Sequence, residues 1–477
     1  MTKKLMSVAA MVAIMGTGAQ AFDTNTAGDI LTRTGMLGKY MHGQPANNTL
    51  RLSTNESGDR LKGDALIFPV FDMQNDWGTE IIFRNNALNH KGGSSAVVAK
   101  VVLYAADDSR ELIDFNVYLS ADDQFRFTIK DGVVKSTDGS VVISENFQTD
   151  DVTFASEASP FEAKVLDPIT KKTVETGYVI VYGMMQPNAT FHDDHKGLFK
   201  RYRETLDDLR DGWRTHHMTL GVYDDDQNTT APDVSTIKGA KDVVATALSG
   251  TERIFNASGE TRDLLLNPTA LENFTDGNLL LWAPGEYAAI ADRQINDDKY
   301  DGSEIRDDSD AFLINNTTYV YNNAKGNVDN KFIITQPTKR FLTQLGFGKD
   351  FWVEVCEDNS PDAANITTGM KWGFQGELRI LDENEQEYSE TIGGGIITSP
   401  ASSSSQSAHC LELTTLGSED LEGQAGEFAN GNGFIKYDMT TGDENGIPAI
   451  ITEMSANRVG GNGEINWVYA PATKLRR

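Results

Sequence analysis

The chain has 477 residues, and its 70 acidic against 42 basic side chains give a formal net charge of −28. This charge argues against nucleic acid and anionic lipid headgroups as partners, because binding to them relies on clustered Lys and Arg. The length is sufficient for two or three domains, each able to bury a core of its own.

The N-terminal residues have the pattern of a secretory signal peptide. Two lysines precede the short apolar run Leu5–Met15, and a small-x-small pattern ends at Ala21. We therefore predict a signal peptide over residues 1–21. No later stretch approaches the ~18 apolar residues of a membrane helix. These features predict an exported protein of the periplasm, the cell surface or the extracellular space, and not an integral membrane protein.

A polar leader, residues 22–60, follows the predicted signal peptide and precedes the first clear strand. Its position allows two interpretations. The leader is either disordered or packed locally against its own chain, or it adds a strand to a neighbouring subunit by β-augmentation.

Strands separated by short turns are predicted from residue 79 to residue 143. Thr79–Asn85 and Ala96–Tyr104 are rich in β-branched residues, which favours central strands. Residues 112–119 and 124–130 alternate apolar and polar side chains, which is the pattern of a half-buried strand. Their apolar positions are Ile113, Phe115, Val117, Leu119, Phe125, Phe127 and Ile129.

Aspartates occur where these strands are expected to end. Asp122 and Asp123 stand between the two alternating segments, where Asp side chains commonly bond nearby backbone N–H groups in a turn. An ion site is the alternative interpretation of this pair. Asp131-Gly132 and Asp138-Gly139 are dipeptides that supply the positive φ angles of tight hairpins.

This pattern predicts an all-β fold built from antiparallel β-sandwich domains of the immunoglobulin-like kind. The first sandwich region is expected to span residues 61–315. Short strands between Gly, Asn and Asp breaks resume later in the chain and predict a second β-sandwich region over residues 316–477.

An insertion at residues 192–217 departs from the β pattern. Its apolar residues recur every three or four positions, which predicts an amphipathic helix near residues 196–211. Such a helix is expected to lie across its own sandwich or across a partner. The stripe consists of Leu198, Tyr202, Leu206, Leu209 and Trp213.

Histidines flank this predicted helix and suggest a metal site. His192, Asp194 and His195 combine imidazole with carboxylate, which suits zinc, copper or nickel. His216 and His217 lie at the far end, and a helix between them would separate the two groups by more than ~20 Å. One ion therefore cannot bind both groups. Surface polar residues beside a helix start are the alternative interpretation.

Calcium is the other cofactor that the sequence suggests. The loop Asp297–Asp308 is rich in carboxylates, but Lys299 occupies a ligand position when Gly302 is aligned with the EF-hand glycine, so that motif fails. A looser calcium site would use Asp297 and Asp301. The alternative is a solvated acidic loop.

Cys356 and Cys410 are the two cysteines of the chain. In an exported protein such a pair is expected to form a disulfide, because the compartment is oxidising. A redox pair or a set of metal ligands would need closer spacing or further ligands.

Several stretches occur in an order that resembles a family of uncharacterised exported β-rich proteins of Gram-negative bacteria. The resemblance covers residues 61–470. It includes a GDxLxxP pattern at Gly63–Pro69, YLSxxD at Tyr118–Asp123 and PTK at Pro337–Lys339. These are mostly strand and turn residues, so the resemblance implies a fold and a compartment, and it brings neither an activity nor catalytic residues.

The chain contains no G-x-S-x-G, H-E-x-x-H or Walker motif. We therefore expect a non-catalytic structural or interaction protein whose partners are copies of itself, other surface proteins or glycans. A binding module for calcium or carbohydrate is the alternative, although the tryptophans favour core burial over an exposed sugar platform. A hydrolase that uses dispersed carboxylates is the second alternative.

Overall fold

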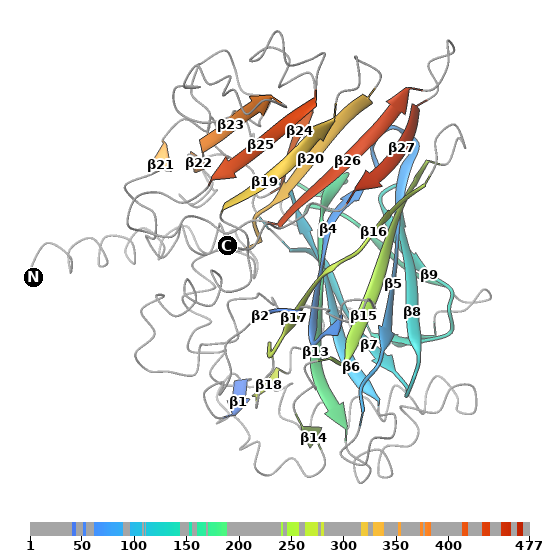
Figure 1. The fold of residues 1–477 in the computed structure, drawn as a ribbon. Helices are drawn as coiled ribbons and strands as arrows, with labels where there is room; N and C mark the ends of the chain where they lie inside the picture. Colours follow the sequence, from blue (N-terminus) through green and yellow to red (C-terminus); the bar gives the residue numbers. More distant parts are fainter. Residues whose placement is uncertain are drawn as a thin grey trace, which may run out of the picture.

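The structure is a computed structural model, shown in Figure 1. The described residues are 41–43, 51–53, 62–88, 96–106, 109, 111–143, 152–154, 160–167, 170–187, 240–241, 246–256, 263–274, 278–280, 316–322, 328–337, 352–353, 373–374, 377–382, 413–417, 432–438, 450–458 and 465–470. Every strand pair among them is antiparallel, which confirms the predicted all-β class.

Two sheets form the N-terminal sandwich. The first sheet has the order β11 (Val152–Phe154), β10 (Val141–Ile143), β7 (Glu111–Leu119), β6 (Val97–Ala105), β13 (Thr176–Pro187), β4 (Ala65–Asp72), β17 (Thr269–Glu272) and β2 (Arg51–Leu52), with β14 (Ala240–Lys241) beside β13. The second sheet has the order β12 (Phe161–Lys164), β9 (Val133–Ser136), β8 (Gln124–Lys130), β5 (Trp77–Asn85), β15 (Leu248–Asn256) and β16 (Leu264–Leu266), with β3 (Lys62–Gly63) beside β15.

The strands after residue 316 pair only with one another in the described part of the chain. One sheet has the order β24 (Leu413–Gly417), β20 (Val328–Thr335), β26 (Ile450–Arg458) and β27 (Ile465–Ala470), and another has the order β19 (Asn316–Asn322), β25 (Asn432–Asp438) and β23 (Glu377–Asp382). A short pair, β21 (Trp352–Val353) with β22 (Gly373–Phe374), also belongs to this part of the chain. Before residue 316, β1 (Met41–Gly43) forms a separate short pair with β18 (Asn278–Leu280).

The C-terminal strands also contact the first sheet directly. The Thr335 hydroxyl donates a hydrogen bond of 2.7 Å to the Pro69 carbonyl oxygen. The Leu413 N–H donates one of 2.8 Å to the Ala106 carbonyl oxygen. Pro69 lies where the register between β4 and β13 shifts, and such an irregularity is one of the few places where a sheet tolerates proline.

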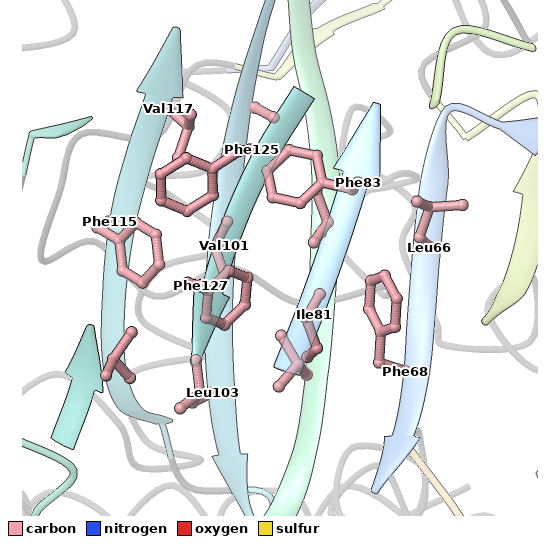
Figure 2. Close-up of a cluster of buried hydrophobic side chains, with 14 of the residues drawn as sticks. Leu66, Phe68, Ile81, Phe83, Val101, Leu103, Phe115, Val117, Phe125 and Phe127 are labelled. Carbon is pink, nitrogen blue, oxygen red and sulfur yellow. The ribbon is translucent and has the colours of Figure 1, made fainter. Parts of the chain in front are cut away.

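One apolar core lies between the two sheets of the N-terminal sandwich (Figure 2). Alternation along each strand sends every second side chain inward, so Phe115 and Val117 from β7 face Phe125 and Phe127 from β8. The ring of Phe115 packs edge-on against that of Phe127, with centroids 5.9 Å apart. Aromatic pairs of this kind add to the burial of apolar area, which is the main stabilising contribution here.

Chain segments cross between the two sheets at one edge of the sandwich. β3 pairs with β15 in the second sheet, and β4 follows it in the first sheet. Gly63 passes so close to the β17 backbone that an added Cβ would lie 2.2 Å from the Leu271 carbonyl oxygen. Only glycine fits this approach of the two backbones.

The two Asp-Gly turns differ from each other. Asp131 and Gly132 both have positive φ angles, 52° and 76°, and join β8 to β9 in the predicted two-residue hairpin. Asp138-Gly139 was predicted to form a hairpin as well, and that prediction is wrong. It leads from β9 in the second sheet to β10 in the first, because β10 pairs with β7 and β11 and not with β9.

The prediction of a half-buried strand holds for β8 but is wrong for β7. On β8 the residues between the core positions are exposed or partly exposed. On β7 the alternate residues Asp114, Asn116 and Tyr118 are as buried as the apolar ones. Alternation identifies which side chains share a face, but it does not show whether that face meets water.

The leader contributes strands to its own chain. Arg51–Leu52 pairs with β17 at the edge of the first sheet, and Met41–Gly43 pairs with β18. These contacts favour the locally packed interpretation of the leader. The predicted helix at 196–211 lies outside the described residues.

Candidate functional site

The residues predicted to bind metal or to form a disulfide all lie outside the described residues. They are His192, Asp194, His195, Asp297, Asp301, Cys356 and Cys410. Within the described part of the chain, no three His, Cys, Asp or Glu side chains gather in a group that could hold a metal ion. The described candidates are therefore the aspartate turns, the outward faces of the two sheets and the buried acid Glu252.

Asp122 and Asp123 form a turn between the two sheets, as predicted. Asp122 has a φ angle of 60°, in the region that Asp tolerates better than most residues. The Asp123 carboxylate accepts hydrogen bonds from the Gln124 N–H at 2.9 Å and from the Ser120 hydroxyl at 3.0 Å. Both of its oxygens therefore act in shaping the turn.

Asp138 lies close to this turn and has the same role. Its carboxylate accepts from the Ser140 N–H at 2.9 Å and from the Arg126 N–H at 2.6 Å. Burial raises the pKa of Asp138 and the nearby charge of Asp123 raises it further, while the hydrogen bonds oppose this shift. The two acids join neighbouring loops at one end of the sandwich.

A fully buried ion pair lies on the outward face of the first sheet. Lys100 on β6 forms it with Asp114 on β7, and both side chains have 0% exposure. The direct cross-strand neighbour of Lys100 is Asn116, so Asp114 reaches the ammonium group diagonally. A charged pair shut away from water in this way fixes the register of β6 and β7, and it is not accessible to a soluble substrate.

Tyrosines extend this buried polar face across β6 and β13. The rings of Tyr104 and Tyr178 stack with centroids 5.1 Å apart. The hydroxyls of Tyr104 and Tyr182 lie 2.9 Å apart, and the Tyr178 hydroxyl donates to the Ser109 hydroxyl at 2.6 Å. Each ring is almost completely buried. We call this group, together with Lys100 and Asp114, the buried polar face.

Sequence reasoning missed the buried polar face, although a signal was available. Lys100 interrupts the otherwise apolar segment AVVAKVVLY, and Asp114 is the acid within the next predicted strand, LIDFNVYL. Opposite charges placed singly on neighbouring apolar strands predict a buried pair, because an unpaired charge would be too costly to bury.

The outward face of the second sheet is exposed and carries charged side chains in rows. Glu80 on β5 lies between Arg126 on β8 and Arg253 on β15 and forms ion pairs with both. Arg253 also donates to Asp263 at 2.9 Å and lies 5.0 Å from the centre of the Phe255 ring. These contacts join three strands side by side across the face.

The rows of charge continue to the other edge of the second sheet. Lys135 on β9 donates to Glu162 on β12 at 2.5 Å, and both side chains are about half exposed. Arg84 and Lys164 are also exposed on this face. The second sheet therefore presents hydrated, mostly cationic side chains, in contrast to the buried polar face of the first sheet.

Glu252 is an acid inside the sandwich. It lies on β15 opposite Ile81 and Leu266, on the inward side that also carries Leu248 and Ile254. Its side chain has 0% exposure, and neither carboxyl oxygen has a hydrogen-bond partner in the described structure. Burial raises the pKa of Glu252 well above its ordinary value, so the carboxyl group retains its proton to higher pH.

Comparison with known proteins identifies no relative of this chain. No family model matches the chain, and neither the curated proteins nor the solved structures include a match. Among the described residues, the structure has no apolar helix of the length needed to cross a membrane. Residues and geometry are therefore the basis for assigning a function.

Proposed function

We propose that this chain is an exported structural or interaction protein that acts by presenting sheet faces and edges to partners. The predicted signal peptide and the resemblance to exported β-rich proteins support export. The sandwich supports the interaction role, because its sheets are broad and antiparallel. Its charged and polar side chains are divided between the buried polar face of the first sheet and the exposed outward face of the second sheet.

The contrast between the two outward faces is the observation that carries the proposal. On the first sheet, Lys100 pairs with Asp114 and the Tyr104 hydroxyl contacts the Tyr182 hydroxyl, and all four side chains are buried. On the second sheet, Arg126 and Lys135 remain about half exposed while they pair with neighbours. The buried face stiffens the sandwich, and the exposed face is available to a partner.

The aspartate turns support the same interpretation. Asp123 and Asp138 each accept backbone N–H bonds on one carboxylate oxygen and a further bond on the other. Carboxylates used in this way hold loops in shape. They provide connections of fixed geometry between the two sheets, as a scaffold requires.

Sedimentation and negative-stain imaging of the purified full chain, with and without calcium, test the proposal. We expect concentration-dependent assembly without added calcium and no turnover on a panel of polysaccharides. Turnover that a single carboxylate substitution abolishes would replace the proposal with a hydrolase. A monomer whose thermal stability depends on calcium would replace it with a cation-binding module.

A further inference from the structure

We propose that the outward face of the second sheet binds an acidic surface of a second copy of this chain. This inference rests on the proposed function, because it names the partner and the surface. We call this surface the basic face and define it by its six cationic side chains: Arg84, Arg126, Lys130, Lys135, Lys164 and Arg253.

Strand alternation places these cations on one side of the sheet. On β5 and β8 the core positions Ile81, Phe83, Phe125 and Phe127 alternate with Arg84, Arg126 and Lys130. On β9 and β12 the residues next to core positions Val134 and Phe161 are Lys135 and Glu162. The ion pairs of Arg126 and Arg253 with Glu80 confirm that these strands share this face.

The charge of the basic face is opposite to that of the molecule. Six cations stand against two acids on the same strands, Glu80 and Glu162, so the face is positive while the whole chain carries −28. Asp131 and Asp263 at the strand ends bind Lys130 and Arg253 and reduce the excess, but cations still outnumber acids six to four. Acidic surface for such a face to bind is therefore abundant on every other copy of the chain.

The cations of the basic face are available for a partner. Arg126 is 53% exposed and Lys135 is 48% exposed, although each has an intramolecular partner. Exposed ion pairs of this kind contribute little to stability, so a carboxylate from another molecule can replace the internal one. Arg84 and Lys164 are exposed and form no ion pair with other described residues.

The sign of the face determines the symmetry of the contact. A two-fold dimer would place the basic face against itself and bring like charges together, which is unfavourable. The face must instead meet a different, acidic surface of the next copy. Such a head-to-tail contact repeats from copy to copy, and it produces a ring or an open filament.

Ionic strength has opposing effects on this contact. Two copies of charge −28 repel each other at long range, and the Debye length falls from ~30 Å at ~0.01 M salt to ~10 Å at ~0.1 M. Moderate salt therefore screens the repulsion between whole molecules while it leaves close ion pairs largely intact. At ~1 M salt, with a Debye length of ~3 Å, the local attraction is screened too. Assembly should be strongest at intermediate salt.

The test compares two charge-reversal variants of the full chain by sedimentation velocity at these three salt concentrations. Arg84→Glu with Lys164→Glu changes the basic face from six cations and four acids to four cations and six acids, and so reverses its sign. Lys171→Glu with Lys172→Glu makes the same change in net charge at exposed positions in the turn before β13, outside the face. A circular dichroism spectrum and a melting temperature matching the wild type establish that each variant is folded.

We expect the wild type and the Lys171/Lys172 variant to form assemblies larger than dimers at intermediate salt. The Arg84/Lys164 variant should need about tenfold or more higher concentration to assemble, because the contact loses its favourable charge pairs. Assembly that both variants weaken equally, or a two-fold dimer, would overturn the inference and leave the proposed function intact. A wild type that stays monomeric under all conditions would overturn both.

Discussion

The two sheets of the N-terminal sandwich share one apolar core but differ in the surroundings of their outward faces. On the first sheet, Lys100 and Asp114 pair at 0% exposure beside stacked tyrosines. On the second, Lys135 and Glu162 pair at about half exposure. The same kind of ion pair therefore has two roles. When buried it determines which strands fit together, and when exposed it leaves charge available for other molecules.

The largest effect should follow from breaking the buried pair on the first sheet. We expect Lys100→Met to lower the free energy of unfolding by ~3–5 kcal/mol, because the buried Asp114 carboxylate would lose the cation with which it is paired. Urea unfolding at neutral pH measures this loss. The double variant Lys100→Met with Asp114→Leu should recover most of it, since an apolar pair can replace a buried ion pair at little cost.

If the loss with Lys100→Met alone were below ~1 kcal/mol, the pair would behave as a surface pair, and the buried polar face would be refuted.

Glu252 tests the interior that the two faces share. Its folded pKa is raised, so the native state binds a proton that the unfolded chain releases above its ordinary pKa of ~4.3. The free energy of unfolding should therefore fall as pH rises from ~4.3 through the raised value. Glu252→Gln should remove this part of the pH dependence, and Glu252→Leu should stabilise the protein by ~1–3 kcal/mol at pH 8.

Urea unfolding of the wild type and both variants from pH 5 to pH 8 provides the comparison. The difference in unfolding free energy between the wild type and Glu252→Gln is the relevant quantity, because other acids contribute equally to both. A difference that stays constant over this range would show that Glu252 is not buried in its protonated form.

A smaller effect is expected at the tyrosines of the buried polar face. Tyr182→Phe removes one of two hydroxyls that lie 2.9 Å apart and leaves Tyr104 without that contact. We expect the free energy of unfolding to fall by ~0.5–1.5 kcal/mol in a thermal unfolding experiment, which is the net contribution of one typical hydrogen bond. Tyr182→Phe combined with Tyr104→Phe should cost less than the sum of the two single changes, because both partners are then apolar.

The smallest effect is expected on the second sheet. Lys135→Ala removes an ion pair of the same chemistry as Lys100–Asp114 but at an exposed position. We expect a change of ~0–1 kcal/mol in the same urea experiment. A loss as large as that of Lys100→Met would show that the basic face is covered, and the contrast between the two sheets would disappear.

The sequence predicted much of the fold because the residues concerned report their own local surroundings. Alternation in β8, the positive-φ turn at Asp131-Gly132 and the bend at Asp122-Asp123 each depend on a few neighbouring residues. The burial of Asp114 could not be predicted in this way, since it depends on Lys100 from another strand and on what covers that face. The prediction of a hairpin at Asp138-Gly139 was wrong for the same reason, because β10 pairs with β7, a strand that is not its neighbour in the sequence.

For the candidate site, local pattern was insufficient. The basic face consists of single cations taken from β5, β8, β9, β12 and β15, which are joined only by the sheet order. No cluster of Lys or Arg marks it in the sequence, and the overall charge of −28 points the other way. Similarly, Glu252 resembles any strand acid until its inward direction is known.

Amine labelling of the native protein, read by mass spectrometry, tests the contrast between the two sheets most directly. Lys135 and Lys164 should react with a water-soluble acylating reagent at the rate of ordinary surface lysines, and Lys100 should remain unmodified until the protein is unfolded in urea. Labelling of Lys100 at the rate of Lys135 under native conditions would contradict the account, because the first sheet would then have no closed polar face.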